Sequence, residues 1–335
     1  MKRLTAALLV FLMILGLSAT GFAQTIKLGT LAPEGSPWHT VLRDMAEAWK
    51  DVSDGDINVR IYAGGVAGDD ADMVRKMRIG QLQAAALTGE GLGNILEDLS
   101  VFQTPMLLRS DEELDYVREN LNARFEAEME EKGFKVLYWS EVGWVYLFAN
   151  QKVVTPEDLK PLDIWVWGGD AAWIDALKDA GYNPVPLPAT EIHSGLQSGL
   201  IDAFATTPVA ALSFQWFGQA KHMLAMKWAP LTAAVVVSKR TWDRIPDDLK
   251  PKIQAAAQKA GDEAKVQIRQ LEAEAVEAMQ TYGLEVHDVS AEVAAMWQTE
   301  LQNAHPRLLG SSIPEEIYTE VVELLETYRA GPGGR

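Results

Sequence analysis

The side chains that most often do chemistry in proteins are scarce in this sequence, and their spacing favours no catalytic or metal site. Cysteine is absent, which excludes a disulfide framework, a thiolate metal site and a catalytic thiol. No pair of histidines has a His-Glu-x-x-His or His-x-His spacing, so zinc has little support. The five histidines are His39, His193, His222, His287 and His305. We therefore expect no metal and no other cofactor.

Other catalytic and ion-binding motifs are incomplete. Asp69, Asp70 and Asp72 lack the twelve-residue calcium loop with its closing glutamate, and a capped helix start explains them better. The glycines of 64–68 lack both the Gly-x-Gly-x-x-Gly form and a following Lys-Ser/Thr, which argues against a phosphate cradle. There is no Gly-x-Ser-x-Gly elbow. An exported hydrolase and a purely structural exported protein are therefore weaker alternatives to a binding protein.

Tryptophan is the unusual residue type. The chain has 11 tryptophans, and most of them fall between Trp139 and Trp242. An indole needs a partner for its N–H group and rarely occupies the deepest core. The cluster therefore suggests a cleft or an interface, although packing between helices and sheet is an alternative for any single tryptophan.

The N-terminal segment has the pattern of a cleavable signal peptide. Lys2 and Arg3 precede an apolar run at 4–17, and small residues at 21 and 23 suit signal peptidase. The run is shorter than the roughly 20 residues that a membrane-spanning helix needs, which argues against an anchor. We expect residues 1–23 to be removed, no lipid anchor because cysteine is absent, and a protein free in the periplasm.

The charge balance excludes one class of partner. The formal net charge is −17 for the whole chain, and loss of the leader with Lys2 and Arg3 makes it −19. Such a surface repels nucleic acid and anionic lipid headgroups. It does not by itself repel a small anion, because the charge within a pocket can oppose the net charge. We expect no nucleic-acid partner.

Strand and helix signals alternate along the chain, which predicts an α/β fold with mostly parallel sheets covered on both faces. About 312 residues would remain after cleavage, too many for one core, since cores stop growing near ~250–300 residues. We predict two lobes with crossing strands and a cleft between them. The predicted divisions are 24–148 plus about 233–275 for lobe I, 149–232 plus about 276–330 for lobe II, and a disordered tail at 331–335.

A single long helix is predicted at 247–282. Apolar residues recur there at steps of three or four, from Ile253 to Tyr282, with a mean step close to 3.6. A helix of this length would run ~54 Å and would have to lie across both lobes. Two helices broken at Gly261 are the alternative.

Six segments, in order and at the expected separations, resemble the solute receptors of tripartite ATP-independent periplasmic (TRAP) transporters. Each match is weak alone, and together they span about residues 25–285. The matching segments are Leu28-Gly-Thr-Leu-Ala-Pro-Glu-Gly-Ser-Pro37, Ile61-Tyr-Ala-Gly-Gly-Val-Ala-Gly68, Met77-Arg-Ile-Gly-Gln-Leu82, Pro105-Met-Leu-Leu108, Thr155-Pro-Glu-Asp-Leu-Lys160 and Leu196-Gln-Ser-Gly-Leu-Ile-Asp202.

The resemblance implies a two-lobed periplasmic binding protein with crossing strands and a long spine helix. It implies that one small-molecule ligand is held between the lobes. The receptor would deliver that ligand to integral-membrane TRAP carrier subunits.

One departure from the family pattern bears on the ligand. Most such receptors carry an arginine on the strand after the Pro-Glu-Asp-Leu-Lys turn, and a second one often follows the glycine that matches Gly143. Here Trp165 and Trp144 stand at those positions. A guanidinium grips a carboxylate bidentately, and a buried carboxylate without such a partner is costly. The sequence thus resembles a branch without the arginine, which is linked with a tetratricopeptide-repeat periplasmic partner.

We therefore expect a tryptophan-lined cleft for a lipophilic or aromatic molecule. The alternatives are an organic acid bound through another residue, with Trp165 packed inward, and an aromatic cage for a quaternary amine with Glu90, Glu141 or Asp170 supplying charge. The candidate ligand-binding residues are Trp38, His39, Glu90, Trp144, Trp165, Trp167, Gly168, His193, Thr206 and Trp216.

Overall fold

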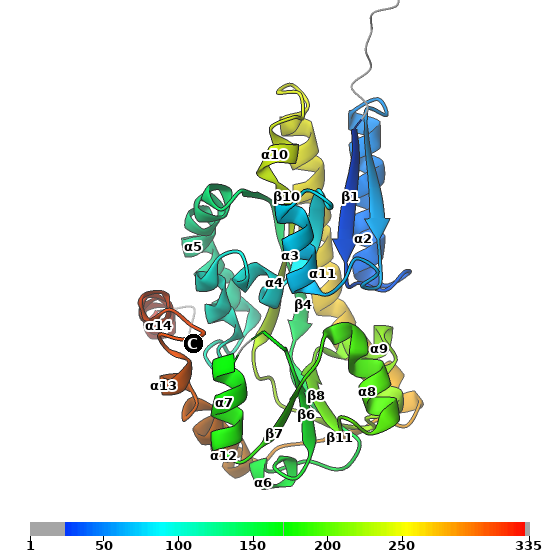
Figure 1. Cartoon of the computed structure of the whole chain (residues 1–335). Helices are drawn as coiled ribbons and strands as arrows, with labels where there is room; N and C mark the ends of the chain where they lie inside the picture. The colour runs from blue at the N-terminus through cyan, green and yellow to red at the C-terminus, as the bar shows by residue number, and fades with distance from the viewer. Residues whose placement is uncertain (1–23, 170, 332–335) are drawn as a thin grey trace, which may run out of the picture.

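The alternation of strands and helices produces two α/β lobes, one above the other in Figure 1. The structure is a computed structural model that describes residues 24–169 and 171–331. The predicted leader, Asp170 and residues 332–335 of the predicted tail lie outside the described residues. Within the described ranges, no helix combines the length and the apolar character that a membrane-spanning segment requires.

Lobe I contains a five-stranded sheet in the order β2-β1-β3-β10-β4. β1 is parallel to β2 and β3, whereas β10 is antiparallel to β3 and β4. The strands are β1 (Gln24–Thr30), β2 (Ile57–Tyr62), β3 (Ala84–Thr88), β4 (Phe134–Trp144) and β10 (Pro230–Ser238). The helices are α2 (Pro37–Val52), α3 (Asp70–Arg78), α4 (Gly89–Gly93), η1 (Glu97–Gln103), α5 (Asp111–Glu131) and α10 (Lys239–Trp242).

Lobe II contains a six-stranded sheet in the order β11-β9-β5-β8-β6-β7. The strands are β5 (Tyr146–Ala149), β6 (Asp163–Val166), β7 (Asn183–Pro186), β8 (Ala203–Thr206), β9 (His222–Leu224) and β11 (Glu285–His287). The helices before the spine are α6 (Pro156–Leu159), α7 (Ala171–Asp179), η2 (Ala189–Glu191), α8 (Ile192–Ser198), α9 (Pro208–Ser213) and η3 (Trp216–Gly218). The chain ends with α12 (Ala291–Gln302), α13 (His305–Leu308) and α14 (Glu315–Ala330).

Three segments of the chain lead from one sheet to the other. Only Val145 separates β4 in one sheet from β5 in the other, and residues 225–229 lead from β9 to β10. The third is the spine helix α11 (Lys250–Thr281), which contacts α2 and β4 in lobe I and α9 in lobe II (Figure 1). Its 32 residues span ~48 Å, so the prediction of one helix across both lobes is confirmed.

The alternative of a break at Gly261 is wrong, and packing explains why glycine stands there. Gly261 is buried in the middle of α11. A Cβ atom at this position would lie 2.6 Å from Cδ2 of Tyr138 on β4. Glycine therefore allows the helix to approach the crossing strand closely, and this contact offsets its low helix propensity.

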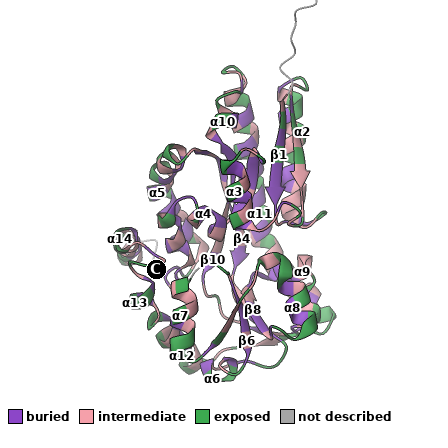
Figure 2. Cartoon of the chain, in the orientation of Figure 1, coloured by how far each residue is buried: buried purple, intermediate pink, exposed green. Residues whose placement is uncertain are grey.

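Buried apolar residues lie on both faces of the sheets, and the outer faces of the helices are exposed (Figure 2). Helix α2 illustrates the cause, since Val41, Leu42, Met45 and Trp49 recur on its one buried face. One helix packs on a different lobe from the one predicted. Residues 276–330 were expected in lobe II, but α14 packs against α5 and η1, so its apolar face completes the core of lobe I.

Candidate functional site

A cavity of about 660 Å³ is lined by residues of both lobes. This volume lies within the range of roughly 300–1,000 Å³ that is typical of small-molecule sites. Lobe I contributes the β1–α2 loop, the end of β3, α4 and β4, and lobe II contributes β6, α7, β8 and α9. The cavity therefore lies where the family resemblance places a ligand.

Aromatic side chains dominate the cavity wall. The rings of Trp165 and Trp167 meet edge to face with centroids 4.9 Å apart, as residues two apart on one extended segment can. Phe214 stacks on Trp216 at 4.5 Å. Seven tryptophans are among the lining residues that the structure describes, namely Trp38, Trp165, Trp167, Trp173, Trp216, Trp228 and Trp297. Such a wall suits a ligand with a large apolar or planar surface.

The indole N–H groups around the cavity fall into two kinds. Nε1 of Trp165 donates to the carbonyl oxygen of Leu187 at 2.9 Å, and Nε1 of Trp297 donates to that of Val154 at 2.7 Å. These two indoles offer the ligand only apolar surface. Nε1 of Trp38 and Nε1 of Trp228 are buried without a hydrogen-bond partner. Neither nitrogen is open to the cavity, so these two indoles also present mainly ring surface to it.

The cavity wall carries no positive charge among the lining residues that the structure describes. Glu90 and Glu97 are the charged residues in that set, and it contains no lysine, arginine or histidine. The Glu90 side chain of lobe I extends to Gly169 of lobe II. Its Oε1 lies so close to Gly169 that a Cβ atom added there would be only 2.9 Å away. A carboxylate ligand would therefore meet acidic groups rather than a guanidinium.

Arg118 stands behind the wall without facing the cavity. Its Nη2 donates to the carbonyl oxygen of Ser140, a lining residue, at 2.6 Å. Its Nη1 lies 3.9 Å from Oε2 of Glu141, and burial lowers its pKa. The guanidinium is thus engaged within the core of lobe I.

The spine helix brings further basic side chains near the hinge, and acidic groups neutralise them. Nη1 of Arg269 lies 2.9 Å from Oδ2 of Asp115, and its Nε lies 2.5 Å from Oε1 of Glu141. Nζ of Lys265 lies 2.6 Å from Oδ1 of Asp115. Glu141, which we considered as a counter-charge for a quaternary amine, is therefore committed to this ion-pair network.

Six of the ten predicted site residues line the cavity. They come from five separate parts of the fold, namely α2, α4, β6 with the residue that follows it, β8 and η3. They are Trp38, Glu90, Trp165, Trp167, Thr206 and Trp216.

The other four predicted residues do not line it. Trp144 is buried in the core of lobe I, where its Nε1 donates to Oδ1 of Asp111 at 2.8 Å. His39 instead closes its own turn, because its Nδ1 accepts from the backbone N–H of Gly35 at 3.1 Å.

Gly168 and His193 are the remaining two. Gly168 is exposed beside the cavity, and its neighbour Gly169 lines the wall instead. His193 lies on the short helix α8, where its Nε2 is 2.9 Å from Nε2 of Gln197. Neither residue is among those that line the cavity.

Several lining residues were not predicted from the sequence. Tyr138, Trp173, Trp228 and Trp297 all line the cavity. The high tryptophan content signalled an aromatic site, but no local pattern showed which indoles would converge. Trp297 comes from α12, far along the chain, and only the return of the C-terminal helices over lobe II brings it to the cavity.

Two aspartates at the start of α3 lie where the lobes meet. Oδ2 of Asp69 accepts from the backbone N–H of Ala189 in lobe II at 3.2 Å, which links the lobes away from the hinge. Asp70 is fully buried and accepts from N and Oγ1 of Thr88, at 3.2 and 2.6 Å. Burial outweighs these bonds and raises the pKa of Asp70 to about 7.

This shift predicts a pH-dependent contribution to stability. Folded Asp70 keeps its proton up to about pH 7, while the unfolded chain loses it near its ordinary value of 3.8. The contribution therefore falls as pH rises between these values. Asp70→Asn imitates the protonated form, so its stability relative to the parent should rise by about 2–3 kcal/mol from pH 5 to pH 8. Urea unfolding of both proteins at pH 5 and pH 8 measures this change. A stability difference between variant and parent that is the same at both pH values would contradict a raised pKa of Asp70.

Comparison with known proteins identifies the family. The model of the family DctP, described as bacterial extracellular solute-binding protein, family 7, matches residues 28–310. The chain belongs to this family. It is accordingly a periplasmic solute-binding receptor of the TRAP type and not an enzyme. Such receptors deliver small ligands to membrane TRAP subunits.

Two curated relatives and one solved structure resemble this receptor along most of its length. The sialic acid-binding periplasmic protein SiaP of Vibrio cholerae is 23% identical, covering 85% of this chain and 89% of that protein. The C4-dicarboxylate-binding periplasmic protein DctP of Rhodobacter capsulatus is 23% identical, covering 88% and 90%. The crystal structure of the sugar acid binding protein DctPAm of Advenella mimigardefordensis with galactonate has a TM-score of 0.85 at 18% identity, covering 91% and 98%. The last comparison confirms the predicted two-lobed α/β fold.

Proposed function

We propose that this receptor binds an uncharged molecule with a large apolar or aromatic surface and presents it to a TRAP carrier. One observation carries the proposal: the described lining residues of the cavity include seven tryptophans and no cationic side chain. Trp165 occupies the position at which the family resemblance places the carboxylate-binding arginine. The faces of these indoles would contact the apolar surface of the ligand.

The charge of the cavity wall distinguishes this receptor from what relatives named for acids would need. The relatives described above are named for sialic acid, a C4-dicarboxylate and a sugar acid. Moving a carboxylate into this cavity would remove its hydration without supplying a guanidinium, which costs several kcal/mol. Glu90 and Glu97 would add repulsion. An uncharged aromatic ligand loses little hydration and gains contact with the indole faces.

Isothermal titration calorimetry tests the proposal with three ligands on the purified receptor. N-phenyl-1-naphthylamine, which is aromatic and uncharged at neutral pH, should bind with a Kd below about 10 µM, equivalent to roughly −7 kcal/mol. Succinate and D-galactonate should give no binding heat at millimolar concentration. Micromolar binding of either acid would contradict the proposal and would favour an organic-acid receptor that uses uncharged donors.

A quaternary amine is a second candidate, favoured by Glu90 and Glu97 beside the indole faces. Tryptophan faces attract such cations, and a nearby carboxylate strengthens the attraction. Choline in the same titration separates the two candidates, because tighter binding of choline than of N-phenyl-1-naphthylamine would favour the aromatic cage. Cleavage of the leader and a tetratricopeptide-repeat partner remain predictions from the sequence.

A further inference from the structure

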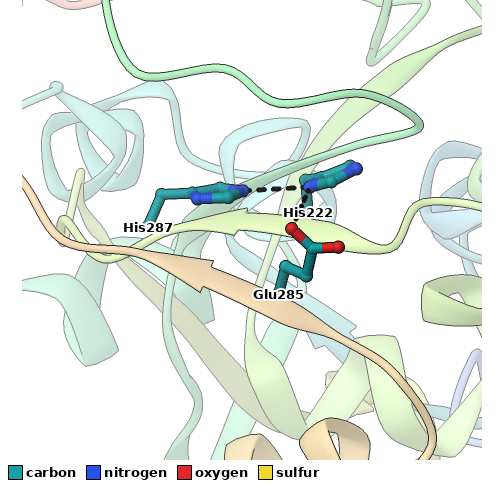
Figure 3. A group of neighbouring side chains, drawn as sticks. All are labelled: His222, Glu285 and His287. Carbon is teal, nitrogen blue, oxygen red and sulfur yellow. Dashed lines mark hydrogen bonds and ion pairs between the residues drawn. The ribbon is translucent and has the colours of Figure 1, made fainter.

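Two histidines and a glutamate meet on one face of lobe II, at the edge of its sheet (Figure 3). His222 begins β9, and Glu285 and His287 are the first and last residues of β11, the edge strand. The two strands are parallel, with Glu285 paired to His222 and His287 paired to Leu224. Because alternate side chains on a strand share a face, Glu285 and His287 point to the side on which His222 lies.

The three side chains approach closely enough to share one ion. Nδ1 of His222 lies 2.9 Å from Nε2 of His287 and 3.6 Å from Oε2 of Glu285. All three potential ligand atoms lie within 4.8 Å of one another. None of the three residues lines the ligand cavity. The cluster is therefore a separate feature that solute binding does not explain.

These separations match those of ligands around a transition metal. Zinc–nitrogen distances are about 2.0–2.1 Å, so two nitrogens that subtend about 90–110° at the metal lie about 2.9–3.4 Å apart. The two imidazoles already have this spacing, and the carboxylate oxygen lies slightly farther out. The Glu285 side chain is 68% exposed and can rotate inward, and the exposure also leaves room for water as a further ligand.

The charges around the cluster allow a divalent cation. Glu285 supplies one negative charge directly, and the net charge of the chain is −17. Lys152 is a positive group near His287 that opposes cation binding in part. Imidazole nitrogens prefer zinc, copper or nickel, whereas magnesium and calcium prefer oxygen ligands.

We propose that His222, Glu285 and His287 bind one divalent transition-metal ion, with Zn²⁺ as the probe of choice. The ion would fasten the edge strand β11, which follows the spine helix, to β9, which precedes the crossing into β10. It would thus join two of the three connections between the sheets at their lobe II ends. The site was not found from histidine spacing because the two histidines are 65 positions apart and only strand pairing unites them.

Calorimetric titration of the chelator-treated full chain with ZnCl₂ tests the site. The parent should bind Zn²⁺ with one-to-one stoichiometry and a micromolar or lower Kd, and its Tm should rise. His222→Ala and His287→Ala should each weaken binding at least tenfold, because even the loss of an outer-shell partner costs about 10–100-fold. His193→Ala is the matched control, since His193 lies on α8 and contacts Gln197.

Circular dichroism should show that each variant keeps the parent fold. Three results would overturn the site: no Zn²⁺ binding below about 1 mM, an equal loss of affinity in His193→Ala, or stabilisation by Mg²⁺ as large as that by Zn²⁺. None of these results bears on the solute cavity, so the metal site and the proposed ligand class can fail independently.

Discussion

Trp165→Arg is expected to weaken binding of N-phenyl-1-naphthylamine by at least about 100-fold, or roughly 2.7 kcal/mol. The Trp165 side chain is only 5% exposed and forms part of the cavity wall. Arginine there would place a permanent charge against an apolar ligand. Covering that charge with an uncharged ligand would strip its hydration. Fluorescence titration measures the change directly, because this probe brightens in apolar surroundings.

Two further variants separate the effect of the added charge in Trp165→Arg from the effect of losing the indole ring. Trp165→Phe keeps an aromatic wall and loses only the bond to Leu187, so its affinity should stay within about tenfold of the parent. Trp139→Arg makes the same substitution off the cavity, where Nε1 of Trp139 contacts Oε1 of Glu126. That variant should bind like the parent. A folded Trp165→Arg protein with unchanged affinity would show that Trp165 does not contact the ligand.

Arg269→Met is expected to lower the free energy of unfolding by about 2–4 kcal/mol, which should lower the Tm by several degrees. The Glu141 side chain is 3% exposed, and Arg269 provides its close ion pair. Without Arg269, the ion pair that remains to the carboxylate among the described residues is the one with Arg118 at 3.9 Å. The loss therefore leaves a buried negative charge largely uncompensated. Urea and thermal unfolding measure both quantities.

The control for this prediction is Lys265→Met on the same helix. The Lys265 side chain is 39% exposed and pairs with Asp115, so its removal should cost less than about 1 kcal/mol. Adding Glu141→Gln to Arg269→Met should restore part of the lost stability, because it removes the uncompensated charge. If Arg269→Met and Lys265→Met lower the free energy of unfolding equally, the burial of the Glu141 carboxylate does not explain the effect of Arg269.

The main elements of the fold could be predicted because their signals are local. Ser36 and Pro37 mark the start of α2, and the apolar steps of three or four residues define the spine helix. Helices such as α4 and α9 are too short to give a periodic pattern. The sequence also places α14 in the wrong lobe. Its apolar stripe could pack on either lobe, and the contact with α5 shows that it packs on lobe I.

The sequence predicts that the site is aromatic better than it predicts which residues line it. Trp165 was found because a tryptophan stood where the family pattern has arginine, and Trp167 followed from strand alternation. Trp144 stood at a comparable motif position, yet its ring turns into the core toward Asp111. The motif position gives the backbone location of a residue, but the side-chain direction depends on the twist of β4 and on the partners packed behind it. Trp228 and Trp297 had no motif at all.

Native mass spectrometry of the receptor, released gently from the periplasm without denaturation, tests the ligand class most directly. We expect a retained molecule that, once extracted, is uncharged at neutral pH and partitions into an organic solvent. Recovery of a dicarboxylate or a sugar acid at one molecule per chain would contradict it. In that case the tryptophan wall would have to hold a carboxylate by means other than a cationic side chain.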